Sequence, residues 1–113
     1  MPQFSANLSM LFPERPFLQR FAAAAQAGFS AVEFMFPYAF AIADLRDAIA
    51  HSKVRVVLHN LPPGDWDAGD RGIACHPNRT EEFRDSVAQA IAYASALQVP
   101  RLNCLAGCTP ADT

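Results

Sequence analysis

The stretch Val54-Arg55-Val56-Val57-Leu58-His59-Asn60 contains the clearest strand of the sequence and decides the fold. Its β-branched and aliphatic residues favour an extended conformation. A run with so little polar alternation is typical of a parallel sheet that is buried on both faces. His59 and Asn60 then lie at the carboxyl end of this strand, where a long irregular segment begins.

Extended and helical runs alternate on both sides of this strand. Further extended runs cover 4–8, 31–34 and 102–106, and apolar residues recur at helical spacing over 17–25, 41–51 and 83–97. Strands that alternate with helices imply right-handed crossovers and a parallel sheet. We therefore expect an α/β fold of order β-α-β-α-β-α-β, with four parallel strands and three helices in one domain over residues 1–113.

Local signals predict where the helices begin and end. Pro16 suits a first helical turn, and Gly28 suits the position just beyond a helix. Asn78, three residues before Glu81, predicts a capping box at the start of the last helix. The stretch 110–113 is expected to be a frayed or cut tail. The apolar stripe expected on the last helix consists of Phe83, Val87, Ala90, Ile91, Ala94 and Leu97.

The composition excludes several classes of function. With 51% hydrophobic and 18% charged residues, the chain is expected to be globular rather than disordered. A formal net charge of −2 offers no basic stripe, so no nucleic-acid partner is expected. No basic amphipathic helix and no apolar stretch of about 20 residues is present, so no membrane association is expected. An odd number of cysteines and an N-terminus without a signal-peptide pattern favour a reducing compartment, the cytoplasm.

Two architectures fit the alternating pattern: an open doubly wound sheet, or part of a (β/α)₈ TIM barrel. In both, functional side chains gather at the carboxyl ends of the strands. Those ends carry Asn7 and Ser9, then Glu33, then His59 and Asn60, and then the residues 103–107. Glu33 lies inside an apolar run and is either an inward-facing functional carboxylate or a structural pair. His59 is either a hydrogen-bonded core histidine or a substrate contact, and Asn60 either caps the turn or contacts substrate.

The segment 61–77 is rich in Pro, Gly and Asp, and loops of this length are typically functional lids or disordered. Arg71 lies between two glycines of this loop. Its guanidinium suits a bidentate grip on a small carboxylate or phosphate. The alternative is an exposed arginine paired with Asp70 or Asp67. Trp66 either closes a pocket or packs the loop down.

Motifs of several well-known chemistries are missing. The sequence has no Gly-x-Gly-x-x-Gly, no Walker A segment and no Gly-x-Ser-x-Gly nucleophile elbow. The three histidines have no metal-type spacing to one another. Cys104 and Cys108 form C-x₃-C, which is neither a zinc nor a redox spacing, and both are interpreted as packing at a strand end. The residues alone predict half a polar pocket, with no catalytic residue and no metal ligand.

Several stretches together resemble the hydroxypyruvate isomerase family of xylose-isomerase-like barrels. The resemblance implies a TIM-type barrel that interconverts hydroxypyruvate and 2-hydroxy-3-oxopropanoate (tartronate semialdehyde) through an ene-diol. A similar branch acts on 2-oxo-tetronates. It also implies a divalent metal, Mg or Mn, and two glutamates that move the proton. The matching stretches are Phe4-Ser5-Ala6-Asn7-Leu8-Ser9-Met10, Ala27-Gly28-Phe29-Ser30-Ala31-Val32-Glu33-Phe34, Phe36-Pro37-Tyr38, Asn60-Leu61-Pro62-Pro63-Gly64-Asp65-Trp66, Arg71-Gly72 and Asn103-Cys104-Leu105-Ala106-Gly107.

The sequence departs from this family in length. Family members are roughly twice as long, as TIM barrels usually are. Their metal ligands and both catalytic glutamates lie in the second half, so Glu33 is not one of them. The chain is expected to be an N-terminal half, inactive alone, that needs the missing C-terminal half or self-association. The alternatives are a non-catalytic half-barrel that binds a small carboxylate, or a remnant without function.

The resemblance carries over only the lining of a pocket for a small 2-oxo or hydroxy acid. Among the lining residues, Arg71 is expected to bind the substrate carboxylate. The full set of substrate-binding residues is Asn7, Glu33, His59, Asn60 and Arg71.

Overall fold

The computed structural model describes residues 2–109, and the predicted tail at 110–113 lies outside them. The elements follow the expected order, except that a short 3₁₀ turn precedes the last helix. None of the helices described is long and apolar enough to cross a membrane. The elements are β1 Ser5–Asn7, α1 Phe17–Gln26, β2 Ala31–Glu33, α2 Ile42–Ser52, β3 Arg55–Asn60, the 3₁₀ turn η1 Pro77–Arg79, α3 Thr80–Leu97 and β4 Leu102–Asn103.

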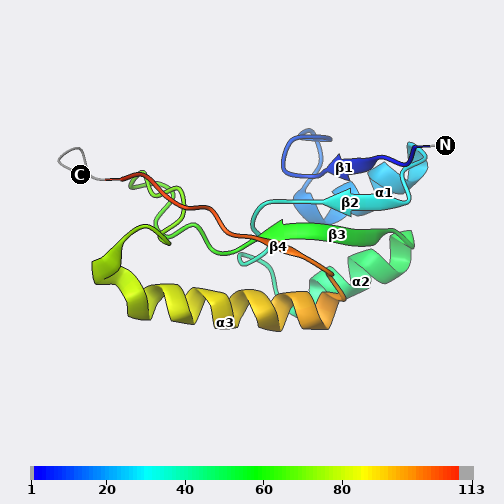
Figure 1. Cartoon of the computed structure of the whole chain (residues 1–113). Helices are drawn as coiled ribbons and strands as arrows, with labels where there is room; N and C mark the ends of the chain where they lie inside the picture. Colours follow the sequence, from blue (N-terminus) through cyan, green and yellow to red (C-terminus); the bar gives the residue numbers. More distant parts are fainter. Residues whose placement is uncertain (1, 110–113) are drawn as a thin grey trace.

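The four strands form one parallel sheet in the order β1-β2-β3-β4, so each strand pairs with the next along the chain. Figure 1 shows the arrows of β1, β2 and β3 side by side and pointing the same way. An open doubly wound sheet reverses its strand order at a switch point, whereas a TIM barrel adds each strand next to the last. The uninterrupted order excludes the doubly wound alternative for the described residues and confirms a partial barrel.

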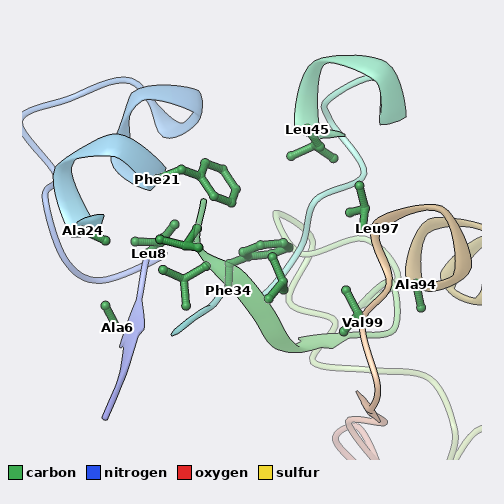
Figure 2. Packing of buried hydrophobic residues seen from close by; sticks show 12 residues of the cluster. Ala6, Leu8, Phe21, Ala24, Phe34, Leu45, Ala94, Leu97 and Val99 are labelled. Carbon is green, nitrogen blue, oxygen red and sulfur yellow. The ribbon is translucent and has the colours of Figure 1, made fainter. Parts of the chain in front are cut away.

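The apolar core lies between the sheet and the helices. Each of the first three strands contributes one side chain to it, and α1 packs against α2 as α2 packs against α3. Figure 2 shows Phe21, Leu8 and Phe34 gathered in this layer, with Leu45 and Val99 reaching in from neighbouring segments. Both Leu8 and Phe21 are fully buried. This one-sided covering leaves the opposite face of the sheet for the barrel interior.

The end of α1 confirms the role predicted for Gly28. The Gly28 N–H donates to the Ala25 carbonyl and the Phe29 N–H to the Ala24 carbonyl, both at 3.0 Å. These two bonds define a Schellman motif, which requires a left-handed residue at its turn. Gly28 supplies it with φ +99°. The chain is thereby redirected from α1 into β2.

The predicted starts of two helices are wrong in detail. Pro16 lies just before α1 in an extended conformation, and the helix begins at Phe17. The predicted capping box is absent, because Pro77 starts the 3₁₀ turn and draws Asn78 into it. The helix α3 therefore begins after Arg79, with no side-chain cap.

Two further predictions need correction. The last strand is shorter than expected, since only Leu102–Asn103 pairs with β3. On α3, Ile91 is 52% exposed rather than part of the buried stripe. The buried face of this helix instead follows i, i+4 spacing through Ser86, Ala90 and Ala94. Ile91 lies one position beyond that row and is turned away from the sheet.

Candidate functional site

All four strands end in a residue with a carboxylate or amide side chain. Asn7 ends β1 and is the register partner of Glu33, which ends β2. Asn60 ends β3 and is the register partner of Asn103, which ends β4. The side chains of this second pair are bonded, because Asn103 Nδ2 donates to Asn60 Oδ1 at 3.2 Å. The expected gathering of polar residues at the carboxyl edge is therefore present. Asn103 was not among the predicted binding residues, although its place after the last strand was the available signal.

The first pair keeps polar groups available. Asn7 Oδ1 accepts the Ser9 N–H at 2.9 Å, which closes a turn after β1. Ser9 Oγ in turn accepts the Met35 N–H at 2.8 Å and ties the ends of β1 and β2 together. The half-buried Glu33 carboxylate has no hydrogen bond or ion pair with any residue between 2 and 109. No structural partner within this range accounts for that carboxylate.

His59 lies in the packed layer behind the strand ends. Its side chain is fully buried and stacks on Phe34, with ring centroids 5.8 Å apart and planes inclined by 5°. Its Nδ1 lies 3.3 Å from Tyr38 Oη and 3.2 Å from the Asn60 carbonyl oxygen. Burial lowers the pKa of His59, so the ring is neutral at pH 7. The ring lies in the core with Nδ1 hydrogen-bonded, while its buried Nε2 has no hydrogen-bond partner among residues 2–109, so both alternatives for His59 stay open.

Tyr38 links this histidine to α3. Its hydroxyl donates to the Asn60 carbonyl, and its ring packs edge-on against Tyr93 of α3 at 5.1 Å. Burial raises the pKa of Tyr38, so the phenol stays protonated. Asn60, which is only 8% exposed, is thus held through both its backbone and its side chain.

The long segment 61–77 is ordered and anchored to the chain after β4. The Leu61 N–H donates to the Asn103 carbonyl at 2.9 Å, and the Cys75 N–H donates to the Ala106 carbonyl at 2.8 Å. Gly72, with φ +93°, approaches so closely that a Cβ there would lie 2.1 Å from the Leu105 carbonyl oxygen. Only glycine fits this contact. The segment forms a fixed rim beside the strand ends.

Asp70 is the hydrogen-bonding centre of this rim. Its carboxylate accepts from Arg79 Nη1 at 3.1 Å and Nη2 at 2.8 Å, and from the Asp65 N–H at 2.7 Å. These bonds, the Arg79 guanidinium first, lower the pKa of Asp70 to about 2. Arg79 also donates to Glu82 on the first turn of α3, at 2.9 and 2.8 Å. The rim is thereby joined to α3.

Arg71 is held without an acidic partner. Its guanidinium lies 3.6 Å over the Trp66 ring, and its Nη1 donates to the carbonyls of Trp66 at 3.0 Å and Asp70 at 2.8 Å. The side chain pairs with neither Asp70 nor Asp67, because the Asp70 carboxylate faces Arg79. Trp66 packs at 60° against Phe36, which follows β2. Through Trp66, the stacked Arg71 is linked to the segment that follows β2.

Metal ligands are not assembled in this part of the chain. Within residues 2–109, no group of three or more His, Cys, Asp or Glu side chains is placed to hold a metal ion. The residues present therefore do not fit the divalent metal that the family resemblance implies. Cys104 and Cys108 are exposed free thiols, so the interpretation of both as packing residues is wrong. The short fourth strand ends before Cys104 and leaves both thiols outside the sheet.

A parallel sheet in sequential order, with helices on one face and polar strand ends beside a fixed rim, defines part of a (β/α)-barrel. The chain belongs to the xylose isomerase-like TIM barrel family, whose model matches residues 21–112. It is 61% identical to the hydroxypyruvate isomerase of Escherichia coli over 98% of this chain and 43% of that protein. It is 48% identical to the 2-oxo-tetronate isomerase of Cupriavidus necator over 99% of this chain and 43% of that protein.

A solved structure confirms the fold. The crystal structure described as an AP endonuclease, family 2, from Brucella melitensis superposes with a TM-score of 0.95 at 48% identity. The superposition covers 98% of this chain and 43% of that protein. The resemblance to the hydroxypyruvate isomerase family is thus confirmed. The chain spans less than half the length of the relatives it matches.

Proposed function

We propose that this chain is part of an isomerase that interconverts hydroxypyruvate and 2-hydroxy-3-oxopropanoate through an ene-diol. The observation that carries this proposal is the 61% identity to the Escherichia coli hydroxypyruvate isomerase across 98% of the chain. The second candidate, a 2-oxo-tetronate isomerase, rests on the 48% identity to the Cupriavidus necator protein. A third candidate, a half-barrel that binds a small carboxylate without turnover, needs only the residues at the strand ends and rim.

The part of this chain is to bind and orient the substrate. Arg71 binds its carboxylate in our proposal, because Nη1 is occupied by two loop carbonyls while Nε and Nη2 have no partner among residues 2–109. That remaining edge of the guanidinium suits a bidentate carboxylate. Stacking on Trp66 fixes the plane of the guanidinium before the substrate arrives.

Of the remaining predicted residues, Asn7 and Glu33 face the substrate in this proposal, while His59 and Asn60 lie behind them. Asn7 offers its amide N–H groups and Glu33 its carboxylate to the hydroxyl groups of the substrate. Asn60 is held from behind by the neutral His59 and by Tyr38. No proton transfer is assigned to these residues. The two catalytic glutamates and the ligands of the divalent Mg or Mn belong, in this proposal, to the length of the relatives that this chain does not span.

The open barrel needs a partner to close it. The outer edges of β1 and β4 pair with no strand among the described residues, and unpaired edges invite association. Large apolar side chains at the sheet ends are exposed as well, with Phe4 at 72% and Met10 at 68%. We infer that the missing barrel half, or failing that a second copy, covers them. Size-exclusion chromatography that finds a stable, well-folded monomer contradicts this inference.

The name of the Brucella melitensis protein refers to a nuclease, whereas we propose no nucleic-acid partner for this chain. The reason is electrostatic. A net charge of −2 provides no basic surface for a phosphate backbone, on which affinity for nucleic acid mainly depends. We also propose a reducing, cytoplasmic location, since all three cysteines are free thiols.

The proposal is tested by reconstitution. This chain is mixed with the part of the Escherichia coli hydroxypyruvate isomerase that it does not match, with Mg²⁺ or Mn²⁺ added. Isomerisation of hydroxypyruvate is then followed by NMR, with a 2-oxo-tetronate as the competing substrate. Activity on hydroxypyruvate is expected. A folded complex that turns over neither substrate refutes the enzyme proposal, and calorimetry of hydroxypyruvate on the chain alone then tests the binding module.

A further inference from the structure

Asp70 lies where it could neutralise Arg71, and it does not. The Arg71 side chain folds back so that Nη1 contacts the carbonyl of Asp70 itself at 2.8 Å. A carboxylate on the same residue is the nearest candidate for an ion pair with this guanidinium. The Asp70 carboxylate instead faces Arg79, with its oxygens 3.1 and 2.8 Å from Nη1 and Nη2. One acidic residue thus lies between two arginines and is committed to the second.

Arg79 is itself fixed from the other side. Its Nε and Nη2 donate to the Glu82 carboxylate, on the first turn of α3, at 2.9 and 2.8 Å. The guanidinium therefore joins the first turn of a long helix to the rim. Both carboxylates lose proton affinity next to it, as the lowered pKa values of Asp70 and Glu82 indicate. Bidentate, charge-assisted pairs of this kind also fix direction, which a single point charge does not.

We propose that Arg79 is a positioning residue that holds the Asp70 carboxylate away from Arg71 and so keeps the Arg71 guanidinium unneutralised for an incoming anion. Without Arg79, Asp70 retains only the bond from the Asp65 N–H, and its carboxylate turns toward the adjacent Arg71. The identity of the anion as a substrate carboxylate rests on the function proposed above. The proposal that Asp70 is kept from pairing with Arg71 does not depend on which anion binds.

The change Asp70→Asn separates this role from a merely structural one. Asp70→Asn keeps an oxygen that can accept the Asp65 N–H, but it removes the charge that competes for Arg71. If Arg79 only stiffens the rim, the double change Arg79→Gln with Asp70→Asn is at least as damaging as Arg79→Gln alone. If Arg79 acts by restraining Asp70, the double change restores what the single change loses. The double variant also has the net charge of the original chain.

Trp66 provides the measurement, because it is the only tryptophan of the chain and lies 3.6 Å from the Arg71 guanidinium. Its fluorescence is quenched with iodide, an anion, and with acrylamide, which is neutral. The ratio of the two quenching constants reports local positive charge and corrects for changes in exposure. When the positive charge of the Arg71 guanidinium near Trp66 is lost or neutralised, the ratio of the iodide to the acrylamide quenching constant is expected to fall roughly two-fold.

The variants are Arg79→Gln, Arg79→Lys, the double change, Arg71→Ala and a matched control, Arg84→Gln. Arg84 is an exposed arginine of α3 that pairs with Glu81 at 3.4 Å. We expect Arg79→Gln and Arg71→Ala to lower the ratio about two-fold. We expect the ratio of the original chain to be kept in three variants: Arg79→Lys, the double variant and Arg84→Gln. A double variant that stays low, or an Arg84→Gln ratio that falls equally, overturns the proposal.

Calorimetric titration with hydroxypyruvate separates the two proposals. If the reconstituted barrel with the original chain shows no binding but the iodide ratios behave as described, the assignment of the anion fails and the positioning role stands. If hydroxypyruvate binds and Arg71→Ala abolishes binding, yet Arg79→Gln changes neither affinity nor iodide ratio, the positioning role fails and the carboxylate grip stands.

Discussion

Replacement of Gly72 by alanine isolates the contact that fixes the rim. Gly72 has φ +93°, and a Cβ built on it lies 2.1 Å from the Leu105 carbonyl oxygen and 2.5 Å from Leu105 Cβ. Two costs follow. A side chain at positive φ costs about 1–2 kcal/mol. Displacing a backbone carbonyl adds about 1–3 kcal/mol, the usual range for overpacking.

Gly28 offers the matched control. Its φ of +99° is nearly the same, but a Cβ there meets nothing within 4 Å. Gly28→Ala therefore includes the backbone cost alone, about 1–2 kcal/mol. The difference between the two variants isolates the close approach of the rim to the segment after β4.

Urea unfolding, followed by far-UV circular dichroism and by Trp66 fluorescence, measures both variants. We expect Gly72→Ala to lose about 2–5 kcal/mol of unfolding free energy, and to lose more than Gly28→Ala by about 1–3 kcal/mol. Equal losses in the two variants refute the reasoning, because they mean that the rim does not rest on Leu105.

Three further predictions follow from the residues described. Lys53 ends α2 at φ 61°, so Lys53→Gly is expected to stabilise the chain by up to about 1 kcal/mol, seen as a higher urea midpoint. The pKa of Asp70 is about 2, below its unfolded value, so its contribution to stability is complete above pH 4 and is lost as the pH falls through 2. Carboxyl NMR titration should show this pKa, and Arg79→Gln should raise it toward the ordinary range. Burial lowers the pKa of His59 below 6.5, so the unfolded state takes up the proton first. Unfolding free energy should therefore fall as the pH drops below 6.5, and His59→Phe should remove that dependence; a pH-independent urea midpoint between pH 5 and 7 counts against it.

The order of strands and helices could be predicted from the sequence because the signals are local. The β-branched run at 54–58 and the glycine after α1 each act on their own few residues. The failed capping box has a local cause too, since Pro77 starts a turn that takes up the expected cap residue. Where two local signals lie next to each other, the sequence pattern does not show which of them is the stronger.

The site was predictable only in part, because its geometry depends on pairing between distant segments. The polar ends of the four strands follow from the alternation of elements. The bond between Asn60 and Asn103 needs the register of β3 and β4, which the sequence does not state. The alternative in which Arg71 pairs with Asp70 or Asp67 is not realised, because Asp70 pairs with Arg79, nine residues away on the next element. Only the packing of the rim against α3 decides between those two arginines.

The most direct test of the proposed function measures kcat/KM for hydroxypyruvate in the barrel reconstituted from this chain and the unmatched part of the Escherichia coli relative. Arg71→Ala is compared with Arg84→Ala as the control on α3. Loss of a charge-assisted bidentate contact to the substrate predicts a fall in kcat/KM of about 100-fold for Arg71→Ala and little change for Arg84→Ala. An active barrel whose kcat/KM is the same for both variants contradicts the role given to Arg71 and to the rim that holds it.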